Sequence, residues 1–330
     1  MIKPTIPAVA VAALCVAAPV LAQRLAFERS LEQSGPAILD VSTVRGKIDV
    51  RAGAPGRIVV VGTVTIRTGW DVPANAAELA RDLVDHPPVE LDGNIVRLRP
   101  PSEAAARRAV TVSYQVEVSP DTQVLTSSES GATAIDRVLG AVTVRTQSGA
   151  IQLTHLGGTA SVTTGSGAVT VEGVAGALSV TTSSSAFSGR FLQGNLRVRT
   201  SSGAVDAELV AAGDADIETG SSTIRLRGLE GGLAAVSQSG RISIQGVPGK
   251  TWDASTGSSS INLAIDSGAP FNVEASSRSG SVKVSGAPVQ GAVSKRRIVG
   301  AVGQGGPLVR ISSGSGAVGI TVADAGASRF

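Results

Sequence analysis

Short runs of alternating aliphatic and polar residues recur along the chain. Residues 142–146, 160–164, 178–182 and 196–200 share the order aliphatic, polar, Val, polar, Thr. Strict alternation of this kind is typical of a β-strand with one buried face. Each of these runs is followed by a corner that contains Ser-Gly or Ser-Ser. A second alternating run comes after the corner. Each period therefore predicts a glycine turn, a strand, a Ser-Gly turn and a second strand.

The pattern repeats with a period of about 18 residues. Its corner serines are Ser130, Ser148, Ser166, Ser184, Ser202, Ser221, Ser239, Ser258, Ser279 and Ser315. The spacing between successive corner serines is 18 or 19 residues up to Ser258, then 21 and finally 36, which is twice 18. Self-similarity at a fixed period indicates a repeat architecture in which each unit packs on its neighbours.

A unit of two short strands cannot bury its apolar face alone, so consecutive units are expected to stack, each strand pairing with the same strand of the next unit. The sequence therefore predicts an all-β fold, a single-stranded β-solenoid with about 18 residues per coil and roughly 11 coils between about Val124 and Val322. At ~4.8 Å per coil it would be on the order of 50 Å long. Residues expected to form one ladder beside the Ser-Gly corner are Thr146, Thr164, Thr182, Thr200 and Thr219.

Two other repeat architectures share features with this pattern. A left-handed hexapeptide helix, found in acyltransferases, has a coil of the same length, and a small or aliphatic residue at every sixth position can be traced from Val144 to Val180. The paired alternating runs and the residues inserted after Val205, Leu226 and Ile244 favour instead a less regular, right-handed β-helix. Calcium-binding nonapeptide repeats are excluded because the sequence has no Gly-Gly-x-Gly-x-Asp run.

Residues 23–122 lack the period and are predicted to cap one end of the solenoid, because a terminal unit must shield the open core. Strands are expected at 38–41, 48–50 and 58–66, and one helix at 74–84, where Leu79 and Leu83 are four residues apart. Long strands at 89–99 and 110–118, joined by a charged loop, would follow. The predicted organisation is a leader at 1–22, the cap at 23–122, the solenoid at 123–322 and a tail at 323–330.

The segment 1–22 has the features of a secretory signal peptide. Lys3 precedes an uncharged apolar stretch from Ala8 to Ala18, and Val20-Leu21-Ala22 resembles a cleavage site, which would leave Gln23 as the new N-terminus. An uncleaved membrane anchor is the alternative, although the stretch is short for a span of roughly 20 residues. A lipoprotein signal is disfavoured by the bulky Leu14 before Cys15. Cleavage would remove Cys15 and Met1, the only cysteine and methionine.

The order of several motifs resembles the bacterial DUF4097 family of adhesin-like envelope proteins with β-strand repeats. These motifs are the exported leader, Leu-Asp-Val-x-x-x-x-Gly-x-Ile-x-Val at 39–50, Ser-Tyr-x-Val-x-Val-x-Pro at 113–120, and the Ser-Gly-x-Val-x-Val coils. The resemblance covers roughly Leu39 to Val322. It implies an envelope or surface location and supplies no catalytic residues.

Composition narrows the function classes. The 330 residues include 40 Gly and 42% hydrophobic residues but only 2% aromatics, so the chain is neither disordered nor collagen-like, and its core must be aliphatic. The net charge of +3 comes from 29 basic and 26 acidic residues, a near balance that predicts no nucleic-acid partner.

Candidate chemistry is sparse. His86 and His155 are the only histidines, and with no orienting partner or zinc-ligand spacing evident for either, neither is predicted to be catalytic or to bind metal. The densest acidic group, formed by Asp206, Glu208, Asp214, Asp216 and Glu218, could bind Ca²⁺ or a substrate weakly. Its favoured interpretation is a solvated face balanced by Arg197, Arg199, Arg225 and Arg227 on neighbouring coils.

Aromatic platforms for sugar binding are few. The aromatic residues of the expected folded region are Trp70, Tyr114, Phe187, Phe191, Trp252 and Phe271. Phe187 and Phe191 replace small residues of their coil and are expected to form an internal plug rather than a surface patch. Lys295-Arg296-Arg297 is expected to be a loop, able to contact anionic envelope polymers.

The sequence thus predicts an exported, non-enzymatic β-solenoid with a structural or adhesive role at the cell envelope, in the periplasm or at the cell surface. No catalytic, cofactor-binding or metal-ligating residue and no cofactor is predicted. Envelope polysaccharide or a surface protein is the expected partner. The alternative is a polysaccharide-binding or polysaccharide-active protein that uses one face of the solenoid.

Overall fold

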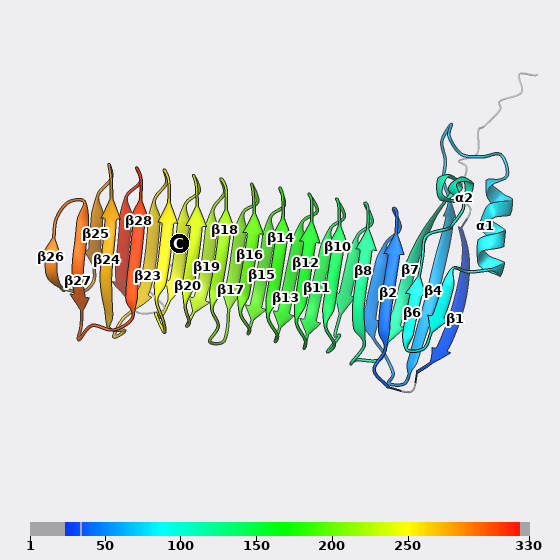
Figure 1. The fold of residues 1–330 in the computed structure, drawn as a ribbon, viewed down its shortest axis with the longest axis horizontal. Coiled ribbons are helices and arrows are strands. Elements are labelled where there is room, and N and C mark those ends of the chain that lie inside the picture. The colour runs from blue at the N-terminus through cyan, green and yellow to red at the C-terminus, as the bar shows by residue number, and fades with distance from the viewer. Residues whose placement is uncertain (1–23, 34, 324–330) are drawn as a thin grey trace, which may run out of the picture.

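Two long β-sheets enclose one continuous apolar core along the length of the molecule (Figure 1). The computed structural model describes residues 24–33 and 35–323. The proposed signal peptide at 1–22 therefore lies outside the described residues. Within the described part of the chain, no helix is long and apolar enough to cross a membrane.

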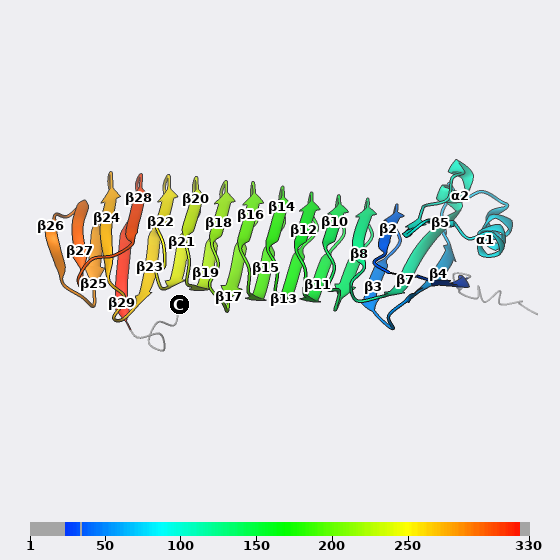
Figure 2. The same cartoon turned by 60° about the horizontal axis from the view of Figure 1, so that its bottom comes forward.

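Both sheets follow the long axis, as the turned view also shows (Figure 2). From the N-terminal end, sheet A consists of β1 (Arg24–Glu32), β4 (Arg57–Ile66), β7 (Val110–Val118), β3 (Ile48–Ala52), β9 (Thr133–Asp136), β11 (Ile151–Leu156), β13 (Val169–Val174), β15 (Phe187–Leu192), β17 (Val205–Leu209), β19 (Ile224–Leu229), β21 (Ile242–Gly246), β23 (Ile261–Asp266), β29 (Val318–Ala323) and β25 (Val282–Ser285). In the same direction, sheet B consists of β5 (Val89–Asp92), β6 (Ile95–Leu98), β2 (Ile38–Thr43), β8 (Gln123–Ser128), β10 (Val142–Thr146), β12 (Ala160–Thr164), β14 (Leu178–Thr182), β16 (Leu196–Thr200), β18 (Ala215–Thr219), β20 (Leu233–Ser237), β22 (Trp252–Thr256), β28 (Leu308–Ser313), β24 (Phe271–Ser277), β27 (Arg297–Val302) and β26 (Val289–Val293).

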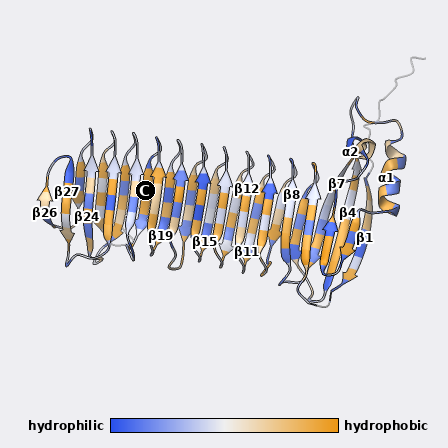
Figure 3. Cartoon of the chain, in the orientation of Figure 1, coloured by the Kyte–Doolittle hydropathy of each residue, from blue (hydrophilic) through white to orange (hydrophobic). Residues whose placement is uncertain are grey.

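The predicted all-β solenoid with 18-residue coils is confirmed. Each coil places one strand in each sheet, and neighbouring coils pair in parallel with equivalent residues opposite one another, as Val162 is opposite Val144 and Val180. These valines are 0–1% exposed, whereas the residues between them face solvent. Figure 3 shows the resulting stripes of hydrophobic and hydrophilic residues. The alternation in the sequence thus fixes which side of each strand is buried.

The threonine ladder at the Ser-Gly corner is present and explains the Ser-Gly-Ala motif. Thr164 is buried between Thr146 and Thr182, and its hydroxyl accepts a hydrogen bond of 3.2 Å from the backbone N–H of Gly167. A Cβ at position 167 would lie 1.8 Å from the carbonyl oxygen of Gly149 on the preceding coil. Glycine is needed at this corner because successive backbones approach too closely for a side chain.

The order of the coils departs from the sequence order at both ends. At the C-terminal end the last coil, β28 and β29, lies between the coil of β22 and β23 and the coil of β24 and β25. At the N-terminal end β2 lies between β6 and β8, and β3 lies between β7 and β9. The expectation that consecutive units always stack on one another is therefore wrong for the terminal coils.

One predicted coil is absent from the C-terminal part. Between 124 and 322 the structure has ten coils with a strand in each sheet rather than roughly 11. The long interval between Ser279 and Ser315 contains β26 and β27, an antiparallel pair that extends sheet B beyond β24. Lys295 and Arg296 lie in the turn that joins them, as expected, whereas Arg297 begins β27.

The N-terminal end is closed by antiparallel strands and by helices. β4 pairs with β1 and β7, and α1 (Ala76–Asp85) packs on β4 and β1. Two local expectations are wrong. Residues 89–99 form a hairpin of β5 and β6 that turns at Gly93, whose φ is +61°, rather than one long strand. The charged loop before β7 contains a second helix, α2 (Ala104–Ala109).

Candidate functional site

The outer surface of sheet B carries a regular array of hydroxyl groups. Its members, called here the hydroxyl face, are Thr143, Ser161, Thr163, Ser179 and Thr181 on β10, β12 and β14. They occupy the second and fourth positions of their strands, which alternation turns away from the core. Register pairing places Ser161 opposite Ser179 and Thr163 opposite Thr181. Equivalent hydroxyls are therefore about 4.8 Å apart along the solenoid axis.

These hydroxyls have unused hydrogen-bonding capacity. The backbone groups of β10, β12 and β14 are paired in the parallel ladder. Within residues 24–33 and 35–323, none of the five hydroxyls forms a hydrogen bond with another part of the chain. A serine or threonine hydroxyl can donate one hydrogen bond and accept two. The hydroxyl face can therefore bind a ligand that is itself rich in hydroxyl groups.

Arginines border the hydroxyl face on both sides. Arg145 lies on β10, and Arg197 and Arg199 lie on β16. Arg197 and Arg199 each contact the carboxylate of Asp216 at 3.0 Å, and Arg199 also pairs with Glu218. Opposite charges on neighbouring strands stabilise the pairing slightly and fix the direction of the side chains.

Shallow grooves follow the two rows of outward side chains. One groove, with a volume of ≈ 500 Å³, runs from Thr143 past Ser161 and Ser179 to Asp216. A second, of ≈ 620 Å³, contains Thr163, Thr181 and Glu218. A third groove of ≈ 370 Å³ lies at the N-terminal end of this row and includes Arg145. Hydroxyl side chains and one arginine line each groove, Arg197 in the first, Arg199 in the second and Arg145 in the third.

The acidic group found in the sequence does not converge on one site. Asp206 and Glu208 lie on β17 of sheet A, whereas Asp216 and Glu218 lie on β18 of sheet B. As expected, arginines on the neighbouring coil pair with them, and Asp206 contacts Arg225 at 3.5 Å and Arg227 at 3.0 Å. In the described chain, no three His, Cys, Asp or Glu side chains come together as a metal site.

Asp214 has a separate role at the edge of the first groove. It accepts a hydrogen bond of 2.8 Å from the backbone N–H of Gly232, and Lys250 contacts its carboxylate at 2.9 Å. These two contacts hold the pKa of Asp214 below its usual value. The backbone N–H of Asp214 donates in turn to the side-chain oxygen of Asn195. Asp214 thus links several successive coils.

The two histidines lie in separate parts of the molecule and each has a carboxylate partner that the sequence did not reveal. Nδ1 of His86, at the end of α1, is 3.1 Å from Asp82, and Nδ1 of His155 is 3.3 Å from Asp136. Partial burial would raise the pKa of Asp136, but hydrogen bonds from Thr154 and His155 and the charge of Arg137 lower it. No serine hydroxyl of the described residues is hydrogen-bonded to either imidazole, so neither arrangement is a Ser-His pair.

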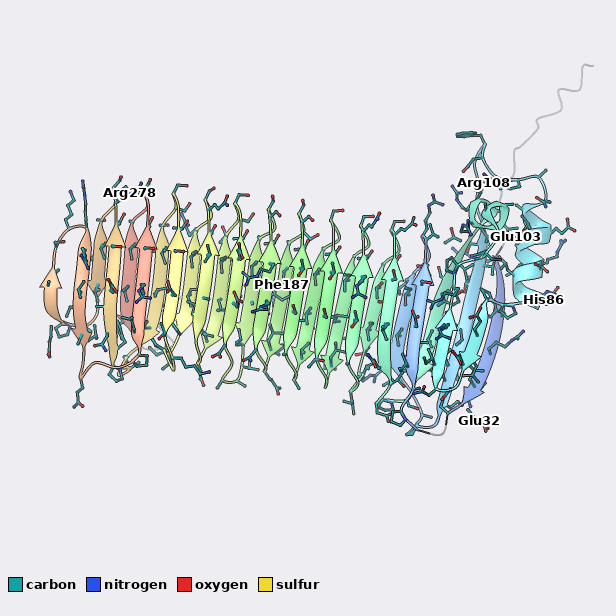
Figure 4. The ribbon with its side chains drawn as sticks, in the orientation of Figure 1. Glu32, His86, Glu103, Arg108, Phe187 and Arg278 are labelled. Atoms are coloured by element: carbon teal, nitrogen blue, oxygen red, sulfur yellow. The ribbon has the colours of Figure 1, made fainter. Side chains whose placement is uncertain are left out.

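The aromatic residues divide between core and surface. Trp252, Tyr114, Phe187 and Phe271 are at most 1% exposed, and the Trp252 indole N–H donates to the carbonyl oxygen of Gly231 at 2.8 Å. Phe187 therefore forms the predicted plug (Figure 4). The same expectation is wrong for Phe191, which is 47% exposed.

Phe191 is exposed because its backbone is left-handed. Its φ is +55°, and Arg137 and His155, at the equivalent positions of earlier coils, also have positive φ. Gly173 and Gly228 have positive φ at the same place in two further coils. A left-handed bulge turns the side chain out of the core, and alternation along the strand cannot predict it.

The hydroxyl face was missed as a site in the sequence because each of its residues also fits an ordinary outward strand position. The signal that could have found it is the repeated pairing of polar residues two positions apart over three successive coils. These residues form a grid because the strands of successive coils have equal length and pair in register. Both properties follow from the 18-residue period.

Fold and surface together define a repetitive, parallel β-solenoid with a polar exterior and no enclosed cleft among the grooves described above. The family model described as Toastrack DUF4097 matches residues 134–321. The chain belongs to the DUF4097 family, in agreement with the resemblance inferred from its motifs. A search of curated proteins finds no match.

Solved structures that are similar to this chain are distant in sequence. A "putative cell adhesion protein" from Clostridium sporogenes is 9% identical, with 91% of this chain and 100% of that chain covered and a TM-score of 0.21. A "putative adhesin" from Bacteroides fragilis is 13% identical, with 90% and 97% covered and a TM-score of 0.27. Another from Parabacteroides distasonis is 10% identical, with 89% and 97% covered and a TM-score of 0.31.

Proposed function

We propose that the protein is an exported, non-enzymatic β-solenoid with a structural or adhesive role at the bacterial cell envelope. The observation that carries this proposal is the long stack of parallel coils, which keeps its register apart from irregularities between β15 and β17 and between β19 and β21. Each coil is bonded along its whole length to its neighbours, so the molecule is a stiff rod with a long surface. A rod of this kind suits a spacer or a binding surface better than an active site, which needs converging groups.

Export is supported by the sequence of the segment 1–22 and by the chemistry of the remainder. After cleavage behind Ala22, the chain would have no cysteine or methionine and would offer no sulfur to oxidation outside the cytoplasm. Its stability then depends on the aliphatic core and the backbone ladders alone. We propose a periplasmic or cell-surface location on this basis.

The alternative function, binding of an envelope polysaccharide, is favoured by one specific feature. The hydroxyl face combines five hydroxyls that have no partner in the described chain with two grooves along its rows. The grooves run along the solenoid axis over several coils, from Thr143 to Asp216 in one and from Thr163 to Gln238 in the other, so an extended polymer fits them better than a small molecule. Arg145 at one border would favour a polymer that carries carboxylates or sulfates.

The cellular location of the chain and its action on polysaccharides test the main proposal. Fractionation of the producing cells should recover the mature chain, beginning at or near Gln23 and without lipid, in the periplasm or at the surface. Incubation with a panel of glycans and anionic polysaccharides should release no products. Recovery of the chain in the cytoplasm would contradict export, and turnover of any polysaccharide would contradict a non-enzymatic role.

Two matched variants test the polysaccharide alternative. Thr181→Glu places a longer, negatively charged side chain on the hydroxyl face, whereas Thr170→Glu places the same side chain on the outward face of β13 in sheet A. If sheet B binds a polysaccharide, Thr181→Glu should weaken binding at least tenfold and Thr170→Glu should leave it unchanged. Equal effects of the two variants would remove the hydroxyl face as the site.

A further inference from the structure

Strand β26 forms a free edge at the C-terminal end of the molecule (Figure 1). It is the outermost strand of sheet B and pairs on one side only, antiparallel to β27. A free edge presents unpaired backbone N–H and C=O groups to any other strand that can approach it.

The other three sheet edges are protected by charge, whereas β26 is not. The charged residues on those edges are Arg24, Glu28, Arg29 and Glu32 on β1, Glu90 and Asp92 on β5, and Lys283 on β25. β26 has the sequence Val-Gln-Gly-Ala-Val, without a charge or a proline. Natural proteins block strand addition with charged residues or proline on edge strands. Among the four sheet edges, β26 is the one that lacks both.

The two valines of β26 extend the core, and one of them is left largely uncovered. Val289 pairs with Val302 and Val293 pairs with Ile298, and both partners are at most 4% exposed. Directly paired residues of antiparallel strands point to the same side, so the two β26 valines lie on the core side of the ribbon. Val293 is nevertheless 61% exposed.

We propose that β26 pairs with β26 of a second copy of this chain, antiparallel and centred on Gly291. This register places Val289 opposite Val293 of the other copy, and the reverse, so that four valines form one apolar strip. Gln290 is then opposite Ala292 of the other copy. An antiparallel pair centred on Gly291 relates the two copies by a twofold axis, so both halves of the interface are equivalent.

Charge determines the direction of pairing. The turn after β26 carries Lys295 and Arg296, and Arg297 follows it. In the antiparallel register this turn lies beside Gly286 and Ala287 of the other copy, which carry no charge. A parallel arrangement would place the two basic turns side by side and would be opposed by their repulsion.

The dimer joins the B sheets of two rods end to end and leaves the helix-capped N-terminal ends at its two extremities. A strand pair of five residues is a small interface, at the low end of specific contacts. Association should therefore be reversible and should depend on protein concentration.

Sedimentation of the full chain over a wide concentration range tests the proposal. We expect a monomer–dimer equilibrium, which Gln290→Lys should shift at least tenfold toward monomer by placing two like charges at the joined edges. Ser312→Lys introduces the same charge on the outer face of β28 and should leave the equilibrium unchanged. Unchanged thermal unfolding would show that both variants are folded. A monomer at every concentration, or a dimer that Gln290→Lys does not affect, would overturn the proposal.

Disulfide formation tests the register. In a Cys15→Ser background, a mixture of Gln290→Cys and Ala292→Cys proteins should cross-link under mild oxidation faster than either protein alone. An antiparallel register centred on Gly291 brings position 290 of one copy opposite position 292 of the other, within the Cα separation that a disulfide needs. Faster cross-linking of each single variant with itself would indicate parallel pairing and would contradict the proposed arrangement.

Discussion

Val309 lies directly beside Trp252 in sheet B, although the coil of β24 and β25 comes between these two residues in the sequence. In space, the coil of β28 and β29 lies between the coil of β22 and β23 and the coil of β24 and β25, and it separates like charges on them. Arg310, next to Val309, contacts Asp253 on one side at 3.3 Å and Glu274 on the other at 3.5 Å. Stacking in sequence order would instead bring Asp253 and Glu274 side by side without a cation between them. Electrostatic pairing between coils thus favours the order that the structure adopts.

Reversing the charge of Arg310 should loosen this end of the rod. Arg310→Glu would place three carboxylates in one row, and we expect the unfolding free energy to fall by about 1 kcal/mol, because all three side chains are partly exposed. Hydrogen exchange should accelerate in β22, β28 and β24. Arg278→Glu, an exposed position near the same end, is the control and should have little effect. Equal exchange in both variants would remove charge as the reason for the coil order.

The middle of the solenoid could be predicted from the sequence almost residue by residue. The alternation of 178–182 gave the buried side, and the 18-residue spacing gave the register in which Val180 pairs with Val162 and Val198. Both are local consequences of strand geometry and a fixed period.

The ends and the bulges could not be predicted in this way. An 18-residue period is the same whether the coil at 308–323 stacks after or before the coil at 271–285, so the order depends on long-range pairing. The hairpin of β26 and β27 occupies one period and therefore resembled a coil. Phe191 has an alternating context like that of Phe187, but its positive φ is a backbone property that composition does not reveal.

Adding one methyl group at the Ser-Gly corner should destabilise the stack. The Cβ of Gly167→Ala would lie 1.8 Å from the carbonyl oxygen of Gly149, so backbone of one coil must move. We expect a loss of roughly 3 kcal/mol, at the upper end for an overpacked site. Ser166→Ala, at the exposed neighbouring position, should cost less than about 0.5 kcal/mol. Thermal or denaturant unfolding compares the two, and similar losses would mean that the corner is less tightly packed than described.

The two phenylalanines of β15 should respond oppositely to truncation. Phe187→Ala empties a position that is 1% exposed and should cost about 3–5 kcal/mol. Phe191→Gly removes an exposed ring from a residue with φ of +55°, and the relief of left-handed strain, about 1–2 kcal/mol, should offset the extra freedom of glycine in the unfolded chain. We therefore expect Phe191→Gly to be neutral or stabilising in chemical denaturation. A loss comparable to that of Phe187→Ala would contradict this account of the bulge.

The contacts of Asp214 predict one component of acid sensitivity. Its pKa in the folded chain is lowered by the Gly232 N–H and by Lys250, so the carboxylate contributes stability above its unfolded pKa. That contribution is lost as the pH falls through the lower folded pKa. The contribution of Asp266 to stability should depend on pH in the opposite direction, because burial and the nearby Glu230 raise its pKa. The difference in stability between wild type and Asp214→Asn should therefore shrink as the pH is lowered below about 4. A difference that stays constant from neutral to strongly acidic pH would show that the carboxylate charge is not involved.

Neighbouring residues of β14 give the most direct test of the two faces. Val180 is fully buried between Val162 and Val198, whereas Thr181 is exposed on the hydroxyl face. Val180→Asp would bury a carboxyl group with no partner, at a cost of several kcal/mol even after its pKa rises and it takes up a proton. Thr181→Asp adds the same group to a solvated surface, where a change within about 0.5 kcal/mol is usual. Thermal unfolding of the two variants should differ widely, and the Val180→Asp protein should regain part of its loss at low pH, where the buried group is neutral. An equal or larger loss for Thr181→Asp would contradict the register of the stacked coils.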